Sequence, residues 1–534
     1  MKPIHVFLLA LQALAFSCKT ENKPPEVAEA TKPAYDEAHR PQFHFSPPSN
    51  WMNDPNGMVY YEGEYHLFYQ YYPDSNVWGP MHWGHAISKD LVRWEHLPIA
   101  LYPDSLGYIF SGSAVMDWRN SSGLGKDGRP PLVAIYTYHN SEGERAGRND
   151  FQTQGIAYSN DKGRTWTKYP GNPVIPNSGN IRDFRDPKVR WHEESKQWIM
   201  VFAAYDHLKI WGAPDLIHWK LLSTFGENAG SHSGVWECPD MFPMQVEGST
   251  DTKWVILSSI NPGGPSGGSA TQYFIGDFDG KKFELDPGFA KEVPKGKGVW
   301  LDGGRDNYAG VTWSDIPAAD GRRIFMGWMS NWAYAQVVPT TAWRSAMTLP
   351  RELTLHLTPG GYRIFSVPVK ELQALRGTRA AIPGAAVEGI LDLGTPLKGI
   401  SPAAMELKLD FIYSGSGADF GVELSNEKGD IYRMGFDAAR QVWYSDRSRS
   451  GKNDFSESFA GARPAEAPRV SGNKTVRFHF FFDTASAELF ADDGANVMTE
   501  IFFPQEPFSN VKVYAGKGKV KLIGGEGFAL RGIW

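Results

Sequence analysis

The chain has 534 residues and a net charge of −6, with 21% charged and 41% hydrophobic residues. This length exceeds what one hydrophobic core supports, so two domains and an export segment are expected. The composition is typical of a soluble globular protein rather than a disordered or membrane-spanning one. No stretch of the sequence forms a stripe of Lys and Arg, which argues against nucleic acid as a partner.

The amino terminus has the features of an export signal. Lys2 precedes an apolar run at residues 6–16, which is too short to span a bilayer but suits a signal peptide over residues 1–18. The run ends in LAFSC, which resembles the lipobox of bacterial lipoproteins and implies that Cys18 is lipidated. An ordinary signal peptide that contains a cysteine is the alternative. Residues 19–40 are rich in Pro, Glu and Ala without apolar periodicity, which predicts a flexible tether.

Cysteine and metal motifs are sparse. The second cysteine, Cys238, has no partner in the mature chain, so no disulfide framework is expected. The sequence contains no HExxH motif, paired Cys ligands or EF-hand loop, so we predict neither a metal nor another cofactor.

From about residue 41 the sequence predicts short strands separated by turns, with almost no helical periodicity. A weak repeat adds detail to this all-β prediction, because an Asp-containing turn is followed by an aromatic residue four times, at Trp94, Trp166, Trp219 and Phe283. This period suits one four-stranded blade per repeat, and roughly five blades over residues 41–365. Chance recurrence of a common hairpin device is the alternative.

The character of the sequence changes beyond residue 370. Residues 372–396 are rich in Ala, Gly and Pro, and alternating strands then resume without the aromatic repeat. Such alternation predicts a second domain, a β-sandwich over residues 375–534, which we expect to support the first domain.

Three carboxylates lie in settings suited to glycosidic chemistry, which usually needs two carboxyl groups. Asp54 lies in the turn sequence WMNDPNG at residues 51–57. Asp186 follows Arg185, whose cation should lower its pKa and keep it ionised. Glu237 follows apolar residues, surroundings that favour the protonated form an acid catalyst needs. Each segment taken alone is equally compatible with a structural turn or loop.

Together and in this order, WMNDPNG, RDP and ECPD resemble the three carboxylate motifs of glycoside hydrolase family 32, the invertases, inulinases and levanases. The similarity extends through residues 66–73, 76–94, 110–114 and 330–353. It implies a five-bladed β-propeller followed by a C-terminal β-sandwich. By resemblance Asp54 is the nucleophile, Glu237 the general acid and then base, and Asp186 the transition-state stabiliser of a retaining double displacement.

The same motifs imply a sugar-binding subsite. Its residues are Asn53, Gln70, Trp78, Phe110, Ser111, Arg185 and Trp332. Residues 302–309 read DGGRDNYA, where Asn307 replaces an aromatic residue of the family pattern; Asp306 is included as a further substrate ligand. Cys238 is interpreted as a packed thiol that tunes Glu237.

The family resemblance implies an exo-β-fructosidase that hydrolyses terminal β-D-fructofuranosyl residues of levan, inulin and also sucrose. Together with the amino-terminal segment it predicts an exported, lipid-anchored protein, which we expect to be a monomer. The sequence leaves open which linkage is preferred, whether the anchor faces the periplasm or the cell surface, and the oligomeric state. Three alternatives remain: an endo-acting levanase or inulinase, an arabinan- or xylan-cleaving propeller enzyme, and an inactive fructan-binding lipoprotein. The second lacks WMNDPNG, and the third has no need of three intact carboxylates.

Overall fold

The computed structural model describes residues 35–415, 417–460 and 463–534. The predicted signal peptide, Cys18 and most of the predicted tether lie outside these residues. No helix of the described residues is long and apolar enough to cross a membrane.

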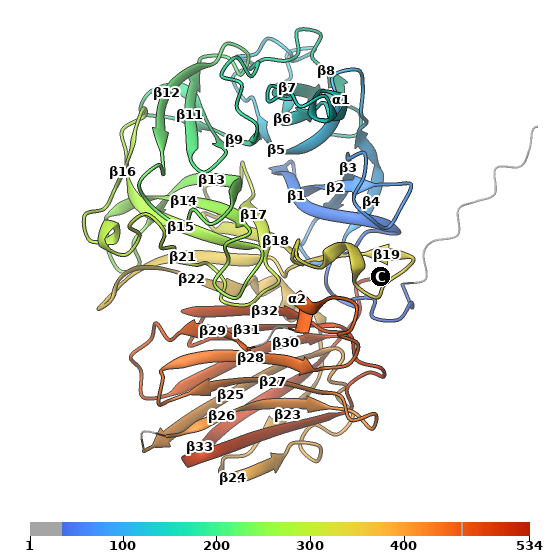
Figure 1. Cartoon of the computed structure of the whole chain (residues 1–534), viewed down its shortest axis with the longest axis vertical. Helices are drawn as coiled ribbons and strands as arrows, with labels where there is room; N and C mark the ends of the chain where they lie inside the picture. Colours follow the sequence, from blue (N-terminus) through green and yellow to red (C-terminus); the bar gives the residue numbers. More distant parts are fainter. Residues whose placement is uncertain (1–34, 416, 461–462) are drawn as a thin grey trace, which may run out of the picture. The chain divides into compact units, whose positions relative to one another are not determined.

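Residues 50–368 form five antiparallel sheets, the blades of a propeller (Figure 1). Blade 1 consists of β1 (Asn50–Tyr61), β2 (Glu64–Tyr72), β3 (His82–Ser88) and β4 (Glu95–Leu101). Blade 2 consists of β5 (Tyr108–Met116), β6 (Leu132–His139), β7 (Gln152–Ser159) and β8 (Thr167–Lys168), with α1 (Ser141–Arg145) between β6 and β7. Blade 3 consists of β9 (Phe184–His192), β10 (Gln197–Ala204), β11 (Leu208–Ala213) and β12 (Lys220–Phe225).

Blade 4 consists of β13 (Val235–Gln245), β14 (Thr252–Asn261), β15 (Ala270–Phe278) and β16 (Phe283–Leu285), followed by the 3-10 turn η1 (Phe289–Lys291). Blade 5 consists of β17 (Tyr308–Thr312), β18 (Arg323–Met329), β21 (Arg351–Thr358) and β22 (Gly361–Pro368), with the short elements η2 (Ala335–Val337), β19 (Trp343–Arg344) and β20 (Ala346–Met347) inserted. β19 pairs in parallel with β1, so the last blade is tied to the first and the ring is closed.

The aromatic repeat predicted from the sequence marks the outermost strand of four blades. Trp94, Trp166 and Trp219 directly precede β4, β8 and β12, and Phe283 opens β16. In each case the Asp carboxylate of the preceding turn accepts backbone N–H groups, which fixes the reversal before the last strand. These acceptors are Asp90, Asp161, Asp215 and Asp279. The prediction of five blades is therefore confirmed, although blade 5 lacks the repeat.

The 3-10 segment η3 (Lys370–Leu375) leads into a second β domain. Its strand β33 is long enough to serve two sheets: its first half pairs with β26, and its second half pairs with β25. The apolar faces of the two sheets enclose one core, which includes Leu407, Phe436 and Phe478. The strands are β23 (Arg376–Ile382), β24 (Ala385–Asp392), β25 (Met405–Ser414), β26 (Asp419–Ser425), β27 (Ile431–Asp437), β28 (Val442–Arg449), β29 (Ala465–Pro468), β30 (Val476–Asp483), β31 (Ser486–Ala491), β32 (Asn496–Ile501) and β33 (Asn510–Leu530), with α2 (Glu457–Ala460) before β29.

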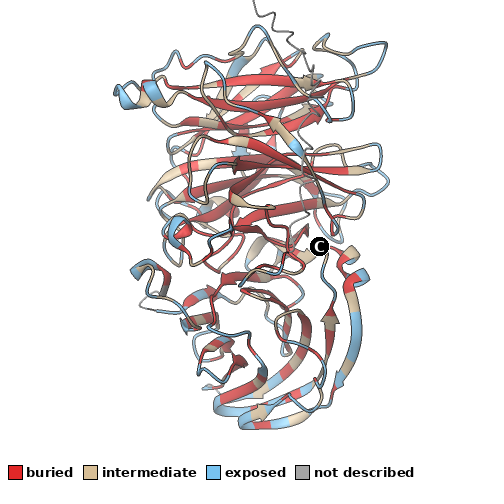
Figure 2. Cartoon of the chain, turned by 90° about the vertical axis from the view of Figure 1, so that its right-hand side faces the viewer, coloured by how far each residue is buried: buried red, intermediate tan, exposed pale blue. Residues whose placement is uncertain are grey.

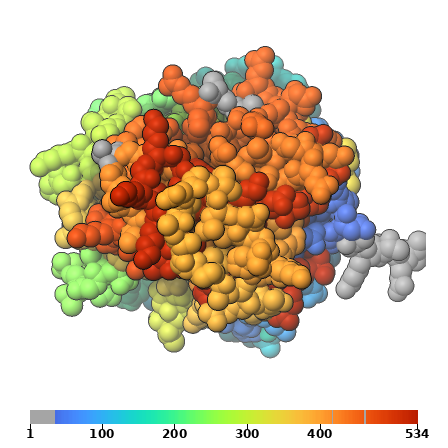
Figure 3. All heavy atoms as spheres, turned by 90° about the horizontal axis from the view of Figure 1, so that it is seen from below, coloured from blue at the N-terminus to red at the C-terminus, as the bar shows by residue number. Residues whose placement is uncertain are grey.

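Burial follows this architecture. Figure 2 shows buried residues along the propeller strands and exposed residues in loops and on the outer strands of the second domain. Figure 3 views the molecule from the side of that second domain, whose orange and red residues cover most of the face.

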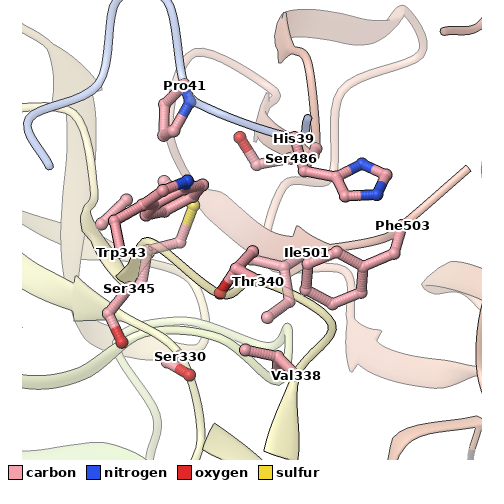
Figure 4. Close-up of a pocket in the computed structure, with 13 residues that line it drawn as sticks. His39, Pro41, Ser330, Val338, Thr340, Trp343, Ser345, Ser486, Ile501 and Phe503 are labelled. Carbon is pink, nitrogen blue, oxygen red and sulfur yellow. The ribbon is translucent and has the colours of Figure 1, made fainter. Parts of the chain in front are cut away.

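The predicted tether extends too far. Tyr35 and Arg40, which the sequence assigned to it, are buried. The Arg40 guanidinium lies 4.4 Å from the Trp343 ring and donates a 2.7 Å hydrogen bond to the Pro47 carbonyl. His39 and Pro41 line a small apolar hollow of about 40 Å³ shared with Trp343 and the second domain (Figure 4). Residues 35–40 therefore belong to the folded unit, because their side chains fill gaps between the two domains.

Buried ion pairs join the propeller to the second domain. His44 contacts Asp483 at 2.7 Å and Glu488 at 2.9 Å, and Arg351 lies between Glu488 and Asp302. Burial alone would lower the pKa of His44, but its hydrogen bonds to Asp483 and Glu488 raise that pKa to about 9. The imidazole is therefore a cation that neutralises buried carboxylates at the domain boundary.

This cation predicts a pH-dependent stability. The pKa of His44 in the folded protein exceeds the value of about 6.5 for an unfolded histidine, so its contribution is complete below pH 6.5 and is lost as the pH rises toward 9. The free energy of unfolding, measured by denaturant titration from pH 6 to 9.5, should fall more steeply for the wild type than for His44→Gln, by up to about 1.4 kcal/mol per pH unit. Parallel curves for the two proteins would contradict the prediction.

Candidate active site

The inner strand of every blade carries a β-bulge within its first residues. In each blade the inner strand has one residue more than its neighbour over the same stretch of pairing: it advances three residues where the neighbouring strand advances two. The bulged segments are 52–55, 109–112, 185–188, 237–240 and 308–311. In three of them the bulged residue has positive φ, at Asp186 (70°), Cys238 (43°) and Ala309 (55°). Such bulges redirect side chains, so residues that regular alternation would point into a blade can face the central channel instead.

The carboxylate of Asp54, on β1, is held by three donors. Ser111 on β5 donates a 2.6 Å hydrogen bond, the Asn53 amide donates one of 3.1 Å, and the Cys238 thiol lies at 3.4 Å. Burial raises the pKa of Asp54, the hydrogen bond from Ser111 opposes this, and the charge of Glu237 raises it further. The three donors fix the direction of the carboxylate while its negative charge is partly offset.

Asp186 behaves differently from the prediction. Burial raises the pKa of Asp186 to about 7; the charge of Arg185 opposes this rise, and the charges of Glu237 and Asp54 add to it. The Arg185 guanidinium is 3.9 Å from Asp186 but only 3.0 Å from Glu237, so it is shared among several carboxylates. Arg185 lowers the pKa of Asp186, as predicted, but burial is the larger effect, so the expectation that the net pKa lies below its usual value is not met.

The surroundings of Glu237 are polar, where apolar ones were predicted. Its Oε1 accepts two hydrogen bonds from Arg185, of 3.0 and 3.1 Å, and its Oε2 accepts one from the Tyr308 hydroxyl. The neighbouring Trp236 points the other way, into the core between blades, because successive strand residues face opposite sides. Both oxygens of Glu237 are thus oriented by donors from β9 and β17.

The three carboxylates line a pocket of about 190 Å³ at the propeller axis. All the predicted catalytic and substrate-binding residues except Asp306 line it together: Asn53, Asp54, Gln70, Trp78, Phe110, Ser111, Arg185, Asp186, Glu237 and Trp332. Aromatic side chains form part of its wall, with the Phe110 ring stacked on His139 at 4.2 Å and the Trp332 ring on Trp51 at 5.7 Å. Polar groups at the base and flat rings at the wall suit a sugar ring.

Asp306 does not belong to this pocket. Its carboxylate is fully buried and accepts hydrogen bonds from Arg447 at 2.7 Å, from Tyr334 and from the Ile501 backbone N–H at 3.0 Å. These partners place it against the second domain, so the prediction that it binds substrate is corrected to a structural role.

Two contacts were not predicted. The hydroxyl of Tyr308, two residues beyond Asp306, donates a hydrogen bond to Glu237. The signal for this contact in the sequence was the position of Tyr308 within the segment DGGRDNYA, next to Asn307. The Cys238 thiol contacts Asp54 and Asp186 rather than Glu237, the residue it was predicted to tune. Burial and the three nearby carboxylates raise its pKa well above the usual value, so it acts as a neutral donor.

Paired carboxyl groups at the axis of a five-bladed propeller, beside an aromatic wall, define a glycoside hydrolase. The chain belongs to glycosyl hydrolases family 32: the profile of that family's N-terminal domain matches residues 44–368, and the profile of its C-terminal domain matches residues 371–526.

Similar proteins support this membership. A levanase of Bacillus subtilis is 49% identical over 502 residues, which cover 94% of this chain and 72% of the levanase. An extracellular exo-inulinase of Aspergillus niger is 37% identical, over 92% of this chain and 94% of the inulinase. The crystal structure of an exo-inulinase from Aspergillus awamori superposes with a TM-score of 0.84 at 34% identity, covering 94% of this chain and all of that one. A β-fructofuranosidase from Schwanniomyces occidentalis complexed with fructosyl-erythritol gives 0.82 at 31% identity, covering 93% and 98%.

The raised pKa of Asp186 predicts a conflict between stability and activity. The native state disfavours the Asp186 carboxylate, so its destabilising effect is complete above pH 7 and disappears as the pH falls toward 4. Asp186→Asn should therefore melt at a higher temperature than the wild type at pH 8, while losing activity, and the gap in melting temperature should narrow at pH 5. Scanning calorimetry at both pH values measures it; a variant that melts lower at pH 8 would contradict the prediction.

Proposed function

We propose that the protein is a retaining exo-β-fructosidase that removes terminal non-reducing β-D-fructofuranosyl residues from fructans such as levan and inulin, and also cleaves sucrose. The observation that carries the proposal is the small size of the pocket that holds the three carboxylates. Its volume of about 190 Å³ is below that of pockets for drug-sized ligands and suits one sugar unit. Beneath the carboxylates the channel narrows to a hollow of about 10 Å³.

A pocket of one sugar unit that narrows beyond its carboxylates favours exo over endo cleavage. An endo-acting enzyme needs room for the chain on both sides of the scissile bond, whereas a chain end can enter a pocket that narrows below. The relatives named levanase and exo-inulinase support fructan as the substrate class. A purely glycan-binding function is disfavoured, because buried carboxylates that destabilise the fold are retained where binding alone would not require them.

In the proposed mechanism Asp54 attacks the anomeric carbon while Glu237 protonates the leaving oxygen, which forms a covalent fructosyl-enzyme. Glu237 then takes a proton from water, and the water releases fructose with retained configuration. Arg185 and Tyr308, which donate to Glu237, hold it toward the leaving group in both steps. Asp186 accepts sugar hydroxyls and stabilises positive charge in the transition state.

Product analysis tests the activity. Purified protein incubated separately with levan, inulin and sucrose should release fructose as the sole early product, measured by chromatography, and the faster polymer identifies the preferred linkage. In Glu237→Gln and in Asp54→Asn the rate of fructose release should fall by a factor of about 10² to 10⁴. Glu284 is an exposed carboxylate on β16, so Glu284→Gln should keep the wild-type rate. A ladder of oligosaccharides would show endo cleavage, and no release from any substrate would favour the glycan-binding alternative.

We further infer that the protein is exported and anchored through Cys18 to a bacterial membrane, and that it is a monomer. The LAFSC sequence at residues 14–18 and the apolar run before it support the anchor, and a relative described as extracellular supports export. Expressed in a bacterial host, the wild type should fractionate with membranes and carry a lipid mass at residue 18. Cys18→Ala should be found in the soluble fraction; finding both proteins soluble and unmodified would exclude the anchor.

A further inference from the structure

A second, larger cavity lies at the opposite end of the propeller channel from the candidate active site. This far cavity has a volume of about 500 Å³ and is lined by the later residues of four inner strands, among them Met116, Lys188, Met241 and Thr312. The same strands bear the pocket residues earlier along the chain. The hollow of about 10 Å³ separates the two spaces, and Asp186 and Lys188 both line it. The far cavity is therefore separate from the site of hydrolysis.

Two arginines of the far cavity stand out because they lack counterions. Arg190, on β9, and Arg323, on β18, approach β13 from the blades on either side of it. The Arg190 guanidinium lies 5.1 Å from the Trp254 ring, and that of Arg323 lies 4.8 Å from the Phe242 ring. The Nε atom of each is buried without a hydrogen-bond partner. In the part of the chain that the structure describes, no carboxylate forms an ion pair with either.

The acidic groups of the far cavity are already engaged. Asp240 accepts the Thr312 backbone N–H at 2.7 Å and pairs with Lys188 at 3.4 Å. Asp315 accepts hydrogen bonds of 2.9 Å from the Met116 backbone and the Trp118 indole. The other charged side chains at the rim of the far cavity also form ion pairs. Arg119 pairs with Glu193, and Arg322 pairs with Asp320 and Glu371.

Partial burial of two guanidinium groups without ion-pair partners is unfavourable; both side chains are half-buried, and the Nε atom of each is fully buried. Burial lowers the pKa of Arg190 to about 9, with the charge of Arg323 adding to the effect, and burial also lowers the pKa of Arg323. A buried cation without a partner destabilises a fold, and a bound anion removes that cost. The geometry of two guanidinium groups facing one space also matches the bidentate recognition of phosphate and carboxylate.

We propose that the far cavity is a binding site for a small organic anion that carries a phosphate or carboxylate group, held by Arg190 and Arg323. The volume leaves room for an organic body beside the anionic group. Trp118, with 57% of its surface exposed, lies at the rim and offers a flat face to that body. The site is independent of the hydrolytic activity proposed above.

The test is a titration of the full-length protein at constant ionic strength with inorganic phosphate, citrate, glucose 6-phosphate and, as the neutral probe, glucose. We expect a saturable rise in melting temperature and a calorimetric binding signal for at least one anion and none for glucose. The anion that binds most tightly distinguishes a phosphate from a carboxylate ligand. No saturable response to any of the three anions, or an equal response to glucose, would overturn the proposal.

Variants separate this site from a general salt effect. Arg190→Gln and Arg323→Gln should each weaken anion affinity about tenfold or more, whereas Arg119→Gln, whose guanidinium is half-exposed and paired with Glu193, should bind as the wild type does. Without anion, both Gln variants should melt at or above the wild-type temperature. With saturating anion, the wild type should melt at the higher temperature.

If a Gln variant does not fold, Arg323→Lys should show the loss of anion affinity, since lysine keeps the charge without the bidentate geometry. Equal anion responses in the wild type and the arginine variants would contradict the proposal.

Discussion

The five β-bulges of the inner strands are the constraint on which the site depends. Without them each inner strand would alternate regularly, and every second side chain would point into a neighbouring blade. Three extra residues in left-handed backbone, including Asp186 and Cys238, turn the chain within the first residues of their strands. The strands of each blade pair beyond the bulge, and the ring is closed by the pairing of β19 with β1, which holds this backbone in place.

The site brings together more negative charge than a protein interior usually holds. The charge of Glu237 raises the pKa of both Asp54 and Asp186, and Arg185 is a cation that lies within 4 Å of Asp186 and Glu237. Neutral donors supply the rest of the compensation, from Ser111, Tyr308 and the Cys238 thiol. Such groups lower the cost of a carboxylate without pairing with it, so the carboxylates stay available to a substrate.

Local signals carried the sequence predictions that succeeded. The Asp turn before each aromatic is set by residues a few positions apart, so four blades could be counted from the sequence. Contacts across strands carried no such signal. Trp236 and Glu237 are neighbours in sequence yet face opposite sides, and Asp306 lies two residues from Tyr308 yet is held by Arg447 of the other domain. Pairing and bulges decide such directions, and they are fixed only when distant strands meet.

The inner strands link two chemically opposite spaces. Along β9 the order Asp186, Lys188, Arg190 runs from the carboxylate pocket to the unpaired guanidinium groups of the far cavity, within five residues of one strand. The negative end attracts the positive charge that develops on a sugar in the transition state, and the positive end disfavours any cation that would neutralise those carboxylates from below. Lys188, which lies between Asp186 and Arg190 on this strand, pairs with Asp240. The strand therefore keeps negative charge at one end of the channel and positive charge at the other. Arg185 is therefore the cation that shares the acidic pocket with the carboxylates, whereas Arg190 and Arg323, which have no ion-pair partner among the described residues, lie one cavity away.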